Sequence, residues 1–496
     1  MSPAFWLSSL LPGSAFSEDA CIEGLAMDSR DVRAGDAFAA VPGILNHGLC
    51  FAQNALAQGA ATILYENPVP ETVDIPDGAI AVSGLRTHLG EMAHALHGRP
   101  SEKMTVVAVT GTNGKTSVVQ LLAQAWEQLG WSAGSMGTLG VQYHGAQHFT
   151  GMTTRNQVQN HVALAQMYGH GIRYVAMEAS SHALDQGRMQ GIRCIFAVFT
   201  NLTRDHLDYH GSMENYAAAK ARLFQVTGLQ FAVVNFDDPF SGALLEKIPD
   251  TVKVIGTSMQ SHPNACVKAE FIKTRNSGFV FDLLVADKRV SVNICLLGLF
   301  NIQNMLSVVA VLHAQGVSQE NIAAVLARLQ PVPGRMSTVV ASAHQPLVVV
   351  DYAHTPDGLA QALDNVSFQT SGRMFCVFGC GGERDRGKRA LMGKIAEERA
   401  QCVILTDDNP RGEDGNRIIQ DIMQGMQHPQ QVIVARDRTS AIAYAISRAR
   451  YGDSVLIAGK GHEQYQEISG QFYSFDDVQT ARVALKANLH LYGEAM

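Results

Sequence analysis

A glycine-rich stretch containing one lysine is the first segment that could do chemistry. Val109 to Thr116 read V-T-G-T-N-G-K-T, between an apolar β-branched run and an amphipathic helical pattern. In such a loop, backbone N–H groups and the helix N-terminus face an anion, the lysine neutralises the β/γ-phosphate charge, and the following hydroxyl can bind Mg²⁺. Val109 stands where the general phosphate-loop pattern has its first glycine. The predicted ATP-phosphate site comprises Gly111, Thr112, Asn113, Gly114, Lys115 and Thr116.

Three side chains further along could bring metal-ion chemistry to this loop. Glu178 ends an apolar strand pattern, where a buried carboxylate needs a partner such as Mg²⁺. His206 follows in a polar segment, and Lys220 lies on an expected helix at Glu214–Phe224. Taken alone, His206 is better explained as a hydrogen-bonded loop histidine, and a lone lysine such as Lys220 is normally a solvated surface residue.

A third candidate for chemistry lies near the C-terminus. Asp408 to Arg411 read D-N-P-R, after an apolar strand pattern and before a helical one. The guanidinium of Arg411 could hold a carboxylate through a bidentate, charge-assisted pair. The structural alternative makes Arg411 a helix-start residue balanced by Glu413 or Asp414.

The elements that must position these residues alternate between strand and helix, which predicts an α/β fold with mainly parallel sheets. We expect central strands at Thr105–Thr110, Tyr174–Glu178, Ile195–Thr200 and Phe231–Asn235, with a helix at Ser117–Leu129. A second series, each member followed by a helical pattern, is expected at Leu347–Asp351, Met374–Phe378, Val403–Thr406, Val432–Val434 and Ser454–Ala458. Ligands should lie at the carboxyl ends of the strands and in clefts between domains.

The length of 496 residues predicts about three domains. We expect a small α/β N-terminal domain over 1–102, a central phosphate-loop domain with a mainly parallel sheet over 103–335, and a C-terminal Rossmann-like α/β domain over 336–496. A Pro/Gly turn at Pro331–Met336 is a candidate hinge for domain closure.

The composition indicates an ordinary globular protein, with 46% apolar and 17% charged residues. The net charge of -7 disfavours nonspecific nucleic-acid binding, so an anionic substrate must meet local cations. No apolar run is long enough for a membrane span, and no basic residue precedes Arg30 as a signal peptide would require. The eight scattered cysteines, including Cys376 and Cys380, predict buried free thiols in a reducing compartment such as the cytoplasm.

Six further segments follow the phosphate loop in a specific order. They are Met177–His182 (M-E-A-S-S-H), Thr200–Gly211 (T-N-L-T-R-D-H-L-D-Y-H-G), Tyr216–Lys220 (Y-A-A-A-K), Gly298–Asn304 (G-L-F-N-I-Q-N), Gly334–Met336 (G-R-M) and Asp351–Asp357 (D-Y-A-H-T-P-D). Together with G-T-N-G-K-T, this series resembles the Mur ligase family over nearly the whole chain.

The resemblance implies an ATP-dependent ligase that forms an amide bond by way of an acyl phosphate. It implies catalytic roles for Lys115, Glu178, His206 and Lys220, and Mg²⁺ ligation by Thr116, Glu178, His206 and Lys220. Lys220 would first be carbamylated by CO₂, because an ammonium group would repel the metal. Asn304, Arg335 and Asp351 resemble the contacts to adenine, γ-phosphate and ribose.

The D-N-P-R sequence resembles that of the members that add meso-2,6-diaminopimelate to UDP-N-acetylmuramoyl-L-alanyl-D-glutamate. The resemblance implies a diaminopimelate site made of Arg389, Asp408, Asn409, Pro410, Arg411, Gly459 and Glu463. Arg411 would hold the distal carboxylate and Glu463 the distal ammonium. Lysine would be rejected because it leaves Arg411 desolvated and unpaired.

The N-terminal motifs Asp28-Ser29-Arg30, Gly35-Asp36 and His47-Gly48 resemble the uridine-diphosphate end of the family's site. The implied contacts to the UDP-linked substrate are Ser29, Thr153, Thr154, Ser180, Gln186 and Arg188. Two positions depart from the family pattern, which usually has Asp where this chain has His47, and Gly or Pro where it has Arg155.

Alternative functions remain at this level. The chain could add L-lysine, act as a folylpolyglutamate synthase-like ligase, or serve as a catalytically inactive scaffold. The first is disfavoured by Arg411, the second leaves the N-terminal motifs unexplained, and the third predicts loss of residues such as Lys115 that are present. We expect a monomer whose partners are small molecules only, with neither nucleic acid nor a membrane span.

Overall fold

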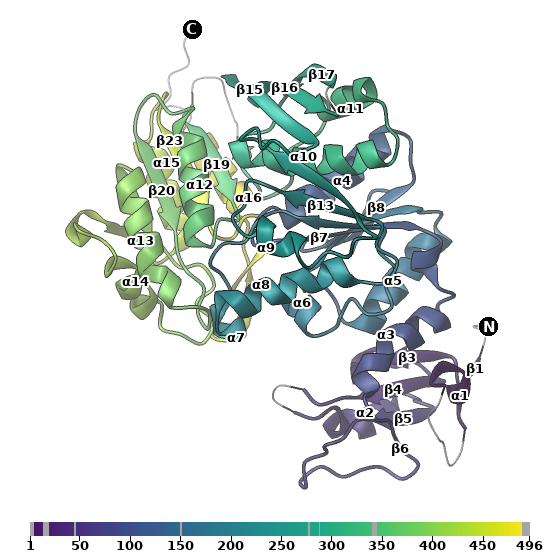
Figure 1. The fold of residues 1–496 in the computed structure, drawn as a ribbon. Coiled ribbons are helices and arrows are strands. Elements are labelled where there is room, and N and C mark those ends of the chain that lie inside the picture. Colours follow the sequence, from purple (N-terminus) through teal and green to yellow (C-terminus); the bar gives the residue numbers. More distant parts are fainter. Residues whose placement is uncertain are drawn as a thin grey trace.

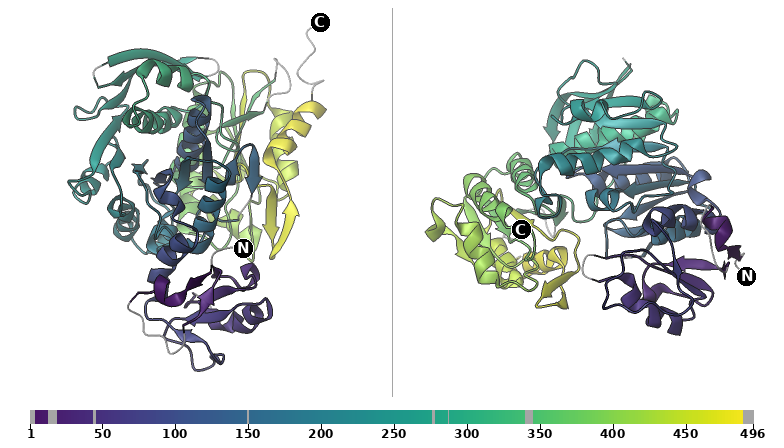
Figure 2. Two further views of the ribbon diagram at one scale, coloured as in Figure 1. Left: turned by 90° about the vertical axis from the view of Figure 1, so that its right-hand side faces the viewer. Right: turned by 60° about the horizontal axis from the view of Figure 1, so that its bottom comes forward.

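The computed structural model describes residues 4–12, 19–43, 46–148, 151–275, 278–286, 288–339 and 345–488. Its strands form three main sheets, one in each third of the fold. The N-terminal unit, purple in Figure 1, lies below the central unit, and the C-terminal unit, green to yellow, lies beside it. Figure 2 shows the N- and C-terminal units against different sides of the central unit.

The N-terminal unit is a four-stranded parallel sheet in the order β3-β4-β5-β6. The strands are β3 (Gly24–Ala26), β4 (Asp36–Ala40), β5 (Thr62–Tyr65) and β6 (Ile80–Ala81), with β1 (Phe5–Trp6) pairing antiparallel to β2 (Cys21–Ile22). The helices are α1 (Leu7–Leu10), α2 (Ala52–Ala57) and α3 (Leu85–Leu96), with 3₁₀ turns η1 (Ser29–Asp31), η2 (Gly48–Phe51) and η3 (Pro100–Glu102). Helix α3 joins this unit to the central one by packing against α5.

The central sheet has eleven strands in the order β10-β9-β8-β11-β7-β12-β13-β14-β15-β16-β17. The strands are β7 (Thr105–Thr110), β8 (Ala133–Gly137), β9 (Gly140–Tyr143), β10 (Ala146–His148), β11 (Tyr174–Glu178), β12 (Phe196–Phe199), β13 (Phe231–Asn235), β14 (Lys253–Ser258), β15 (Val267–Arg275), β16 (Gly278–Val285) and β17 (Lys288–Ile294). The strands from β8 to β15 in this order are parallel, and antiparallel hairpins extend both edges.

Helices cover both faces of the central sheet. They are α4 (Lys115–Gln128), α5 (Gln157–Gly169), α6 (Ser181–Asp185), α7 (Leu207–His210), α8 (Met213–Ala221), α9 (Ser241–Leu245), α10 (Leu299–Ala314) and α11 (Gln319–Leu326), with the turn η4 (Arg222–Gln225). Successive residues of β7 alternate between two buried clusters. Val107 and Val109 pack with α4 and α10, whereas Val106 and Ala108 pack with α5. A strand buried on both faces reads as a continuous apolar run, as β7 does.

The C-terminal sheet has the order β18-β19-β23-β20-β21-β22, and only its edge pair β18–β19 is antiparallel. Its strands are β18 (Ser337–Val339), β19 (Leu347–Asp351), β20 (Met374–Phe378), β21 (Cys402–Leu405), β22 (Ile433–Val434) and β23 (Ser454–Ala458), and β24 (Tyr465–Ile468) with β25 (Gln471–Ser474) forms a separate hairpin. The helices are α12 (Pro356–Ser367), α13 (Gly387–Arg399), α14 (Gly415–Met423), α15 (Arg438–Arg448) and α16 (Asp477–Ala487), with the turn η5 (Pro429–Gln431).

The α/β class and the predicted strands are confirmed, and β7, β11, β13, β19, β20 and β23 have the predicted bounds. Strand β12 is one residue shorter at each end, β21 begins and ends one residue earlier, and β22 lacks Val432. Helix α4 begins two residues before the predicted start, because Gly114 adopts a left-handed conformation and caps it. Helix α8 ends at Ala221 and continues as a 3₁₀ turn.

The mainly parallel central sheet is confirmed, with antiparallel hairpins at both of its edges. One expectation needs correction, because β23 is followed by the β24–β25 hairpin instead of a helix. The boundaries near 102 and 335, and the hinge at Pro331–Met336, stay predictions. No helix in the described ranges is long and apolar enough to cross a membrane. All eight cysteines are free, but the prediction that they are buried is wrong for Cys21, Cys50 and Cys295, which are exposed.

Candidate functional site

The phosphate loop joins β7 to α4 and is packed tightly against the end of β12. A Cβ atom added to Gly111 would lie 1.8 Å from Thr200 Oγ1, so only glycine fits there. Lys115 Nζ donates hydrogen bonds of 2.8 Å to the carbonyl oxygens of Gly111 and Thr112. Burial lowers the pKa of Lys115. The loop is therefore formed before any nucleotide arrives, with its lysine folded over it.

The loop is held by residues of two domains. Thr200 Oγ1 donates to the Asn113 carbonyl at 2.6 Å, and the Asn113 amide N–H donates to Asn201 Oδ1 at 2.9 Å. From the C-terminal unit, Asp357 Oδ2 accepts a hydrogen bond from Asn113 Nδ2 at 3.2 Å. The loop thus marks the seam between the central and C-terminal units.

Arg335 crosses this seam. Its Nη2 donates to the Thr116 hydroxyl at 3.0 Å, and its guanidinium lies 4.6 Å from the ring centroid of Tyr352. Its Nε is buried and has no hydrogen-bond partner among the described residues. A buried N–H of a guanidinium without an acceptor is costly, so this geometry suits an anionic ligand at the loop.

Asn304 and Asp351 lie at the same seam. A Cβ atom on Gly114 would lie 2.4 Å from Asn304 Oδ1, so the Asn304 side chain is against the phosphate loop. Asp351 Oδ2 accepts a hydrogen bond from the Met336 N–H at 2.7 Å. Burial raises the pKa of Asp351 to about 6. Their nucleotide contacts stay predictions.

Glu178, at the end of β11, is buried beside the loop. Its carboxylate accepts from the Thr138 N–H at 2.8 Å and from the Thr138 hydroxyl at 3.1 Å. With Thr153, Thr154 and Arg155 it lines a small cavity. Each carboxylate oxygen has lone-pair capacity left over, which a metal ion can use.

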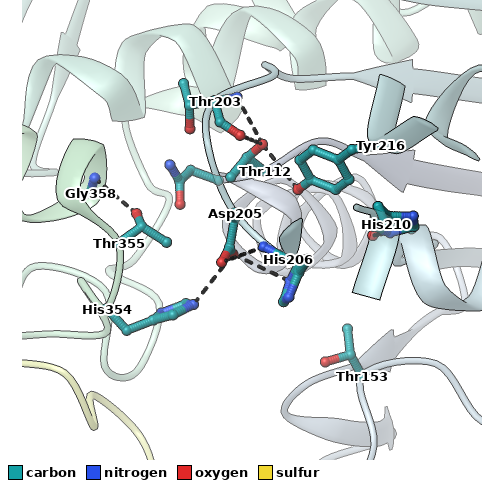
Figure 3. Close-up of polar contacts among 12 residues, drawn as sticks. Thr112, Thr153, Thr203, Asp205, His206, His210, Tyr216, His354, Thr355 and Gly358 are labelled. Atoms are coloured by element: carbon teal, nitrogen blue, oxygen red, sulfur yellow. Dashed lines mark hydrogen bonds and ion pairs between the residues drawn. The ribbon is translucent and has the colours of Figure 1, made fainter. Parts of the chain in front are cut away.

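Lys220 is only 1% exposed, so the solvated-surface alternative is wrong. Its Nζ lies 4.3 Å from the ring centroid of Tyr216, and it forms no ion pair with any described carboxylate. Burial, together with the charge of Lys115, lowers the pKa of Lys220 well below its usual value. The Tyr216 hydroxyl lies 3.1 Å from Thr112 Oγ1 (Figure 3). The Tyr216 ring therefore lies between Lys220 and the phosphate loop.

His206 faces the same region from the start of α7. Its backbone is left-handed, with φ 53°, and its Nε2 lies 3.3 Å from Asp205 Oδ2. Burial lowers its pKa to about 3, so the imidazole is neutral and can bind a metal. Asp205 lies between His206 and His354, whose Nε2 is 3.9 Å away in the C-terminal unit (Figure 3). The described residues include no group of three His, Cys, Asp or Glu that could hold a metal by itself.

The D-N-P-R segment meets the β24–β25 hairpin. Arg411 Nε lies 3.1 Å from Glu467 Oε2, and its Nη1 donates to the Gly382 carbonyl at 2.8 Å. The alternative partners were wrong, because Glu413 binds Arg389 and Asp414 caps α14. The argument that lysine would leave Arg411 unpaired is also wrong, since the guanidinium already has a carboxylate and a carbonyl.

Glu463 belongs to a network with two residues of the same pocket. Its Oε2 accepts from Lys460 Nζ at 2.9 Å and from Asn409 Nδ2 at 2.8 Å. Lys460 also donates to Asn409 Oδ1 at 2.9 Å, so all three side chains are fixed together. Gly459 is left-handed, and a Cβ there would lie 2.4 Å from Asp408 Oδ2. Pro410 is buried between these groups.

Arg389 is 1% exposed and lies between α13 and α14. Its guanidinium pairs with Glu413 at 3.0 Å and with Asp421 at 2.9 Å. Two carboxylates therefore already pair with this arginine, while its buried Nε has no hydrogen-bond partner among the described residues. Its contact to the amino-acid substrate stays a prediction.

A cavity of about 820 Å³ separates the N-terminal unit from the start of α5. Its lining includes Met27, Asp28 and Arg30, whereas Ser29 is buried at the start of η1 and is not part of the lining. His47 is also buried, and its Nδ1 accepts from the Leu49 N–H at 3.1 Å.

The other predicted contacts to the UDP-linked substrate lie in the central unit. Ser180 caps α6 by accepting from the Ala183 N–H, and Arg188 donates to Gln186 Oε1 at 2.6 Å and to the Thr154 carbonyl at 2.9 Å. Their roles in binding stay predictions.

Sequence analysis missed four residues at these sites, namely Thr138, Asp205, Tyr216 and Glu467. Asp205 and Tyr216 lie inside segments that were singled out, and Tyr216 precedes Lys220 by four positions, which puts both on one helix face. Thr138 and Glu467 gave no comparable signal, because their partners are distant in the chain.

A strand–loop–helix phosphate site at a seam between α/β units defines a multidomain nucleotide-binding protein. Three family models match the chain: "Mur ligase family, catalytic domain" over residues 21–97, "Mur ligase middle domain" over 109–312, and "Mur ligase, glutamate ligase domain" over 334–461. The chain belongs to the Mur ligase family.

Relatives that match nearly the whole chain support this assignment. The UDP-N-acetylmuramoyl-L-alanyl-D-glutamate--2,6-diaminopimelate ligase of Xylella fastidiosa (strain 9a5c) is 53% identical over 481 residues, covering 97% of each chain. The ligase of the same name from Coxiella burnetii is 42% identical, covering 97% of this chain and 99% of the relative. A solved structure of a ligase of this name has a TM-score of 0.69 at 34% identity, covering 98% of this chain and all of its own.

The fold extends to more distant ligases. Folylpolyglutamate synthase from Mycobacterium tuberculosis, solved with ADP and AMPPCP, has a TM-score of 0.64 at 17% identity, covering 82% of this chain and 95% of its own. At that identity the similarity concerns the fold alone.

Proposed function

We propose that this protein is the ATP-dependent ligase that joins meso-2,6-diaminopimelate to UDP-N-acetylmuramoyl-L-alanyl-D-glutamate in peptidoglycan precursor synthesis. The observation that carries the proposal is the meeting of the phosphate loop with Arg335 at the seam between the central and C-terminal units. The relatives that are 42–53% identical bear the name of this activity. The folylpolyglutamate synthase-like alternative is supported by similarity of the fold alone.

The reaction has two steps. The substrate carboxylate takes the γ-phosphoryl group of ATP, which gives an acyl phosphate and ADP, and the amine then displaces phosphate. The protein must screen two anions from one another in the first step. Lys115 and Arg335 supply that charge, since Lys115 belongs to the loop, Arg335 contacts it through Thr116, and neither forms an ion pair with a described carboxylate.

The donor set near the loop fits Mg²⁺, which would screen the phosphate charge and polarise the transferring group when bound. The ligands would be the Thr116 hydroxyl, the Glu178 carboxylate and the neutral His206 imidazole. An ammonium on Lys220 does not fit this set, because like charges repel.

Carbamylation removes that conflict. Burial lowers the pKa of Lys220 and so favours the neutral amine, which is the nucleophilic form. Attack of Nζ on CO₂ forms an N–C bond and releases one proton, and it leaves a carboxylate at the tip of the side chain. The ring of Tyr216 holds the lysine stem in place while this happens.

Selection of diaminopimelate rests on the shape of the C-terminal pocket. Gly382 and Glu467 fix the Arg411 guanidinium, and its remaining N–H groups can grip a distal carboxylate. Glu463 would face the distal ammonium. A lysine substrate gains nothing from Arg411, so rejection comes from a missing attraction and not from an unpaired charge.

The remaining assignments belong to the same proposal. Ser29, Thr153, Thr154, Ser180, Gln186 and Arg188 would contact the UDP-linked substrate, and Asn304 and Asp351 the adenosine of ATP. We expect a monomer in the cytoplasm, because the reaction consumes ATP and a uridine nucleotide and the predicted site uses only one chain.

The test is ADP release by the purified protein with ATP, Mg²⁺ and UDP-N-acetylmuramoyl-L-alanyl-D-glutamate, with meso-diaminopimelate or L-lysine added in parallel. We expect release with diaminopimelate only. Release with lysine alone would contradict the substrate assignment and leave the ligase chemistry intact. No release with either amino acid, in a protein that still binds ATP, would favour the inactive-scaffold alternative.

A further inference from the structure

Arg155 connects two cavities. It lines the small cavity that contains Glu178, and it lines the cavity of about 820 Å³ beneath the N-terminal unit. Among the described residues, Met152 is the only other one that lines both cavities. Any ligand that extends from one cavity to the other must pass the Arg155 side chain.

The guanidinium of Arg155 is half-buried, and it forms no hydrogen bond or ion pair with any residue that the structure describes. Arg33, which also lines the larger cavity, is exposed, whereas two other nearby arginines have partners. Arg30 donates to Asp28 at 2.9 Å, and Arg188 donates to Gln186 and Thr154. A partly desolvated guanidinium with five unused N–H donors is unfavourable unless a ligand satisfies it.

The charge of Asp31 acts on Arg155, but no acidic side chain of the larger cavity forms an ion pair with its guanidinium. Asp28 accepts from Arg30, Asp31 accepts from Gln159 Nε2 at 2.8 Å, and Asp36 accepts from the Arg33 N–H at 2.9 Å. Arg155 also stands directly before α5, whose N-terminus adds a small positive potential. The junction of the cavities is thus the place where an anion gains most.

We propose that Arg155 binds the diphosphate of the UDP-linked substrate and so determines its affinity in this protein. The inference rests on the proposed function. In that substrate the nucleoside and the reacting D-glutamyl carboxylate are at opposite ends, and the diphosphate lies between them. With the carboxylate beside Glu178 and the nucleoside in the larger cavity, the doubly charged group falls at the junction. A planar guanidinium matches two phosphate oxygens with two parallel hydrogen bonds.

The test compares the affinities of uridine, UMP and UDP for wild-type protein, Arg155→Ala and Arg155→Lys by calorimetric titration. Loss of one charged pair corresponds to about a ten-fold or greater weakening. We expect Arg155→Ala to weaken the affinity for UDP by that factor and to change the affinity for uridine by no more than about two-fold. The change in affinity for UMP should lie between these two. Arg155→Lys keeps the charge without the fork and should recover part of the UDP affinity.

Arg289→Ala is the matched control, since it removes one arginine from the exposed β16–β17 hairpin far from both cavities. It should leave all three affinities unchanged. The same variants are assayed for KM of the complete UDP-linked substrate, which should rise for Arg155→Ala, whereas KM for ATP and diaminopimelate should not.

The outcomes separate this inference from the proposed function. Unchanged UDP affinity in a folded Arg155→Ala protein would overturn the diphosphate assignment, even if KM for the complete substrate rose, because the contact would then be to its peptide carboxylates. A wild-type protein that neither binds UDP nor turns over the UDP-linked substrate would overturn the proposed function, and this inference with it.

Discussion

The phosphate site and the amino-acid pocket handle charge in opposite ways. At the phosphate loop, Lys115 and Lys220 are buried without a carboxylate partner among the described residues. In the C-terminal pocket, by contrast, Arg411 pairs with Glu467 and Lys460 pairs with Glu463. One site leaves its cations unneutralised, and the other neutralises its own charges.

The difference follows from what each site does. Unpaired buried cations are unfavourable in the free protein, so phosphate, CO₂ or a metal-bound anion gains binding free energy at this site. For the same reason, a buried amine such as Lys220 becomes reactive. Paired charges hold their geometry in the free protein, and a substrate must share or exchange partners to bind. The first arrangement favours chemistry, and the second favours selection by shape.

The largest expected effect is at Lys220. Lys220→Ala and Lys220→Arg should lower kcat by about 10²–10³-fold, because neither side chain can become a carbamate that screens the transferring phosphoryl group. The affinity for ATP should change much less. Steady-state kinetics checks this, and ¹³C NMR with labelled bicarbonate should give a carbamate signal in wild-type protein only.

Lys247→Ala, at an exposed position, is the control for removal of a lysine and should keep full activity. A Lys220→Arg protein with normal kcat would contradict the carbamate assignment. It would also contradict the contrast between a reactive site and a paired site.

The second effect concerns pH at the seam. The pKa of Asp351 is raised from 3.8 to about 6 by burial, so the folded protein holds this proton more tightly than the unfolded chain. The associated stability is present below pH 4 and is lost as pH rises through 6, by about 3 kcal/mol. Asp351→Asn should lack this loss, so its melting temperature relative to wild type should increase between pH 4 and 7 in calorimetry.

Equal pH dependence in the two proteins would show that Asp351 ionises freely and that the seam is more hydrated than the structure indicates. Asp250→Asn, at an exposed turn, should leave the pH dependence unchanged.

The smallest effects are expected in the paired pocket. Arg411→Ala should raise KM for diaminopimelate by about 10–100-fold, with KM for ATP unchanged, because a charged contact is lost and Glu467 remains unpaired. Glu467→Gln should change the same KM by less than about three-fold, since the amide still orients Arg411. Together they form a double-mutant cycle read by steady-state kinetics.

A double variant whose KM is the product of the two single effects would mean that Arg411 and Glu467 act independently, which contradicts the description of a paired pocket. Glu246→Gln, on the exposed side of the molecule near α9, serves as the control for Glu467→Gln.

The fold could be predicted to a large extent from local patterns. β7, β11, β19 and β23 are apolar runs buried on both faces, and their bounds follow from the sequence alone. The hairpins at both edges of the central sheet were not predicted, because outer strands such as β15 and β17 carry mixed polar patterns that resemble loops. The β24–β25 hairpin was not predicted for the same reason, since much of it is exposed.

The sites were predictable as sets of residues and only partly as contacts. The phosphate loop depends on consecutive residues, and its geometry follows from Gly111, Gly114 and the start of α4. The partner of Arg411 was wrong because Glu467 comes from a hairpin 56 positions further along, which no local pattern connects to D-N-P-R. The sequence also gave no sign that Arg389 is already paired.

By itself, the sequence determined the α/β class, the phosphate loop and the order of the family motifs, because these depend on neighbouring residues and on periodic burial. Only the tertiary structure decided which charges are neutralised. Whether Lys220 is solvated, Arg411 paired or Arg155 free depends on burial and on side chains brought from distant elements, and an ionisable group's behaviour is set by that environment and not by its neighbours in the chain.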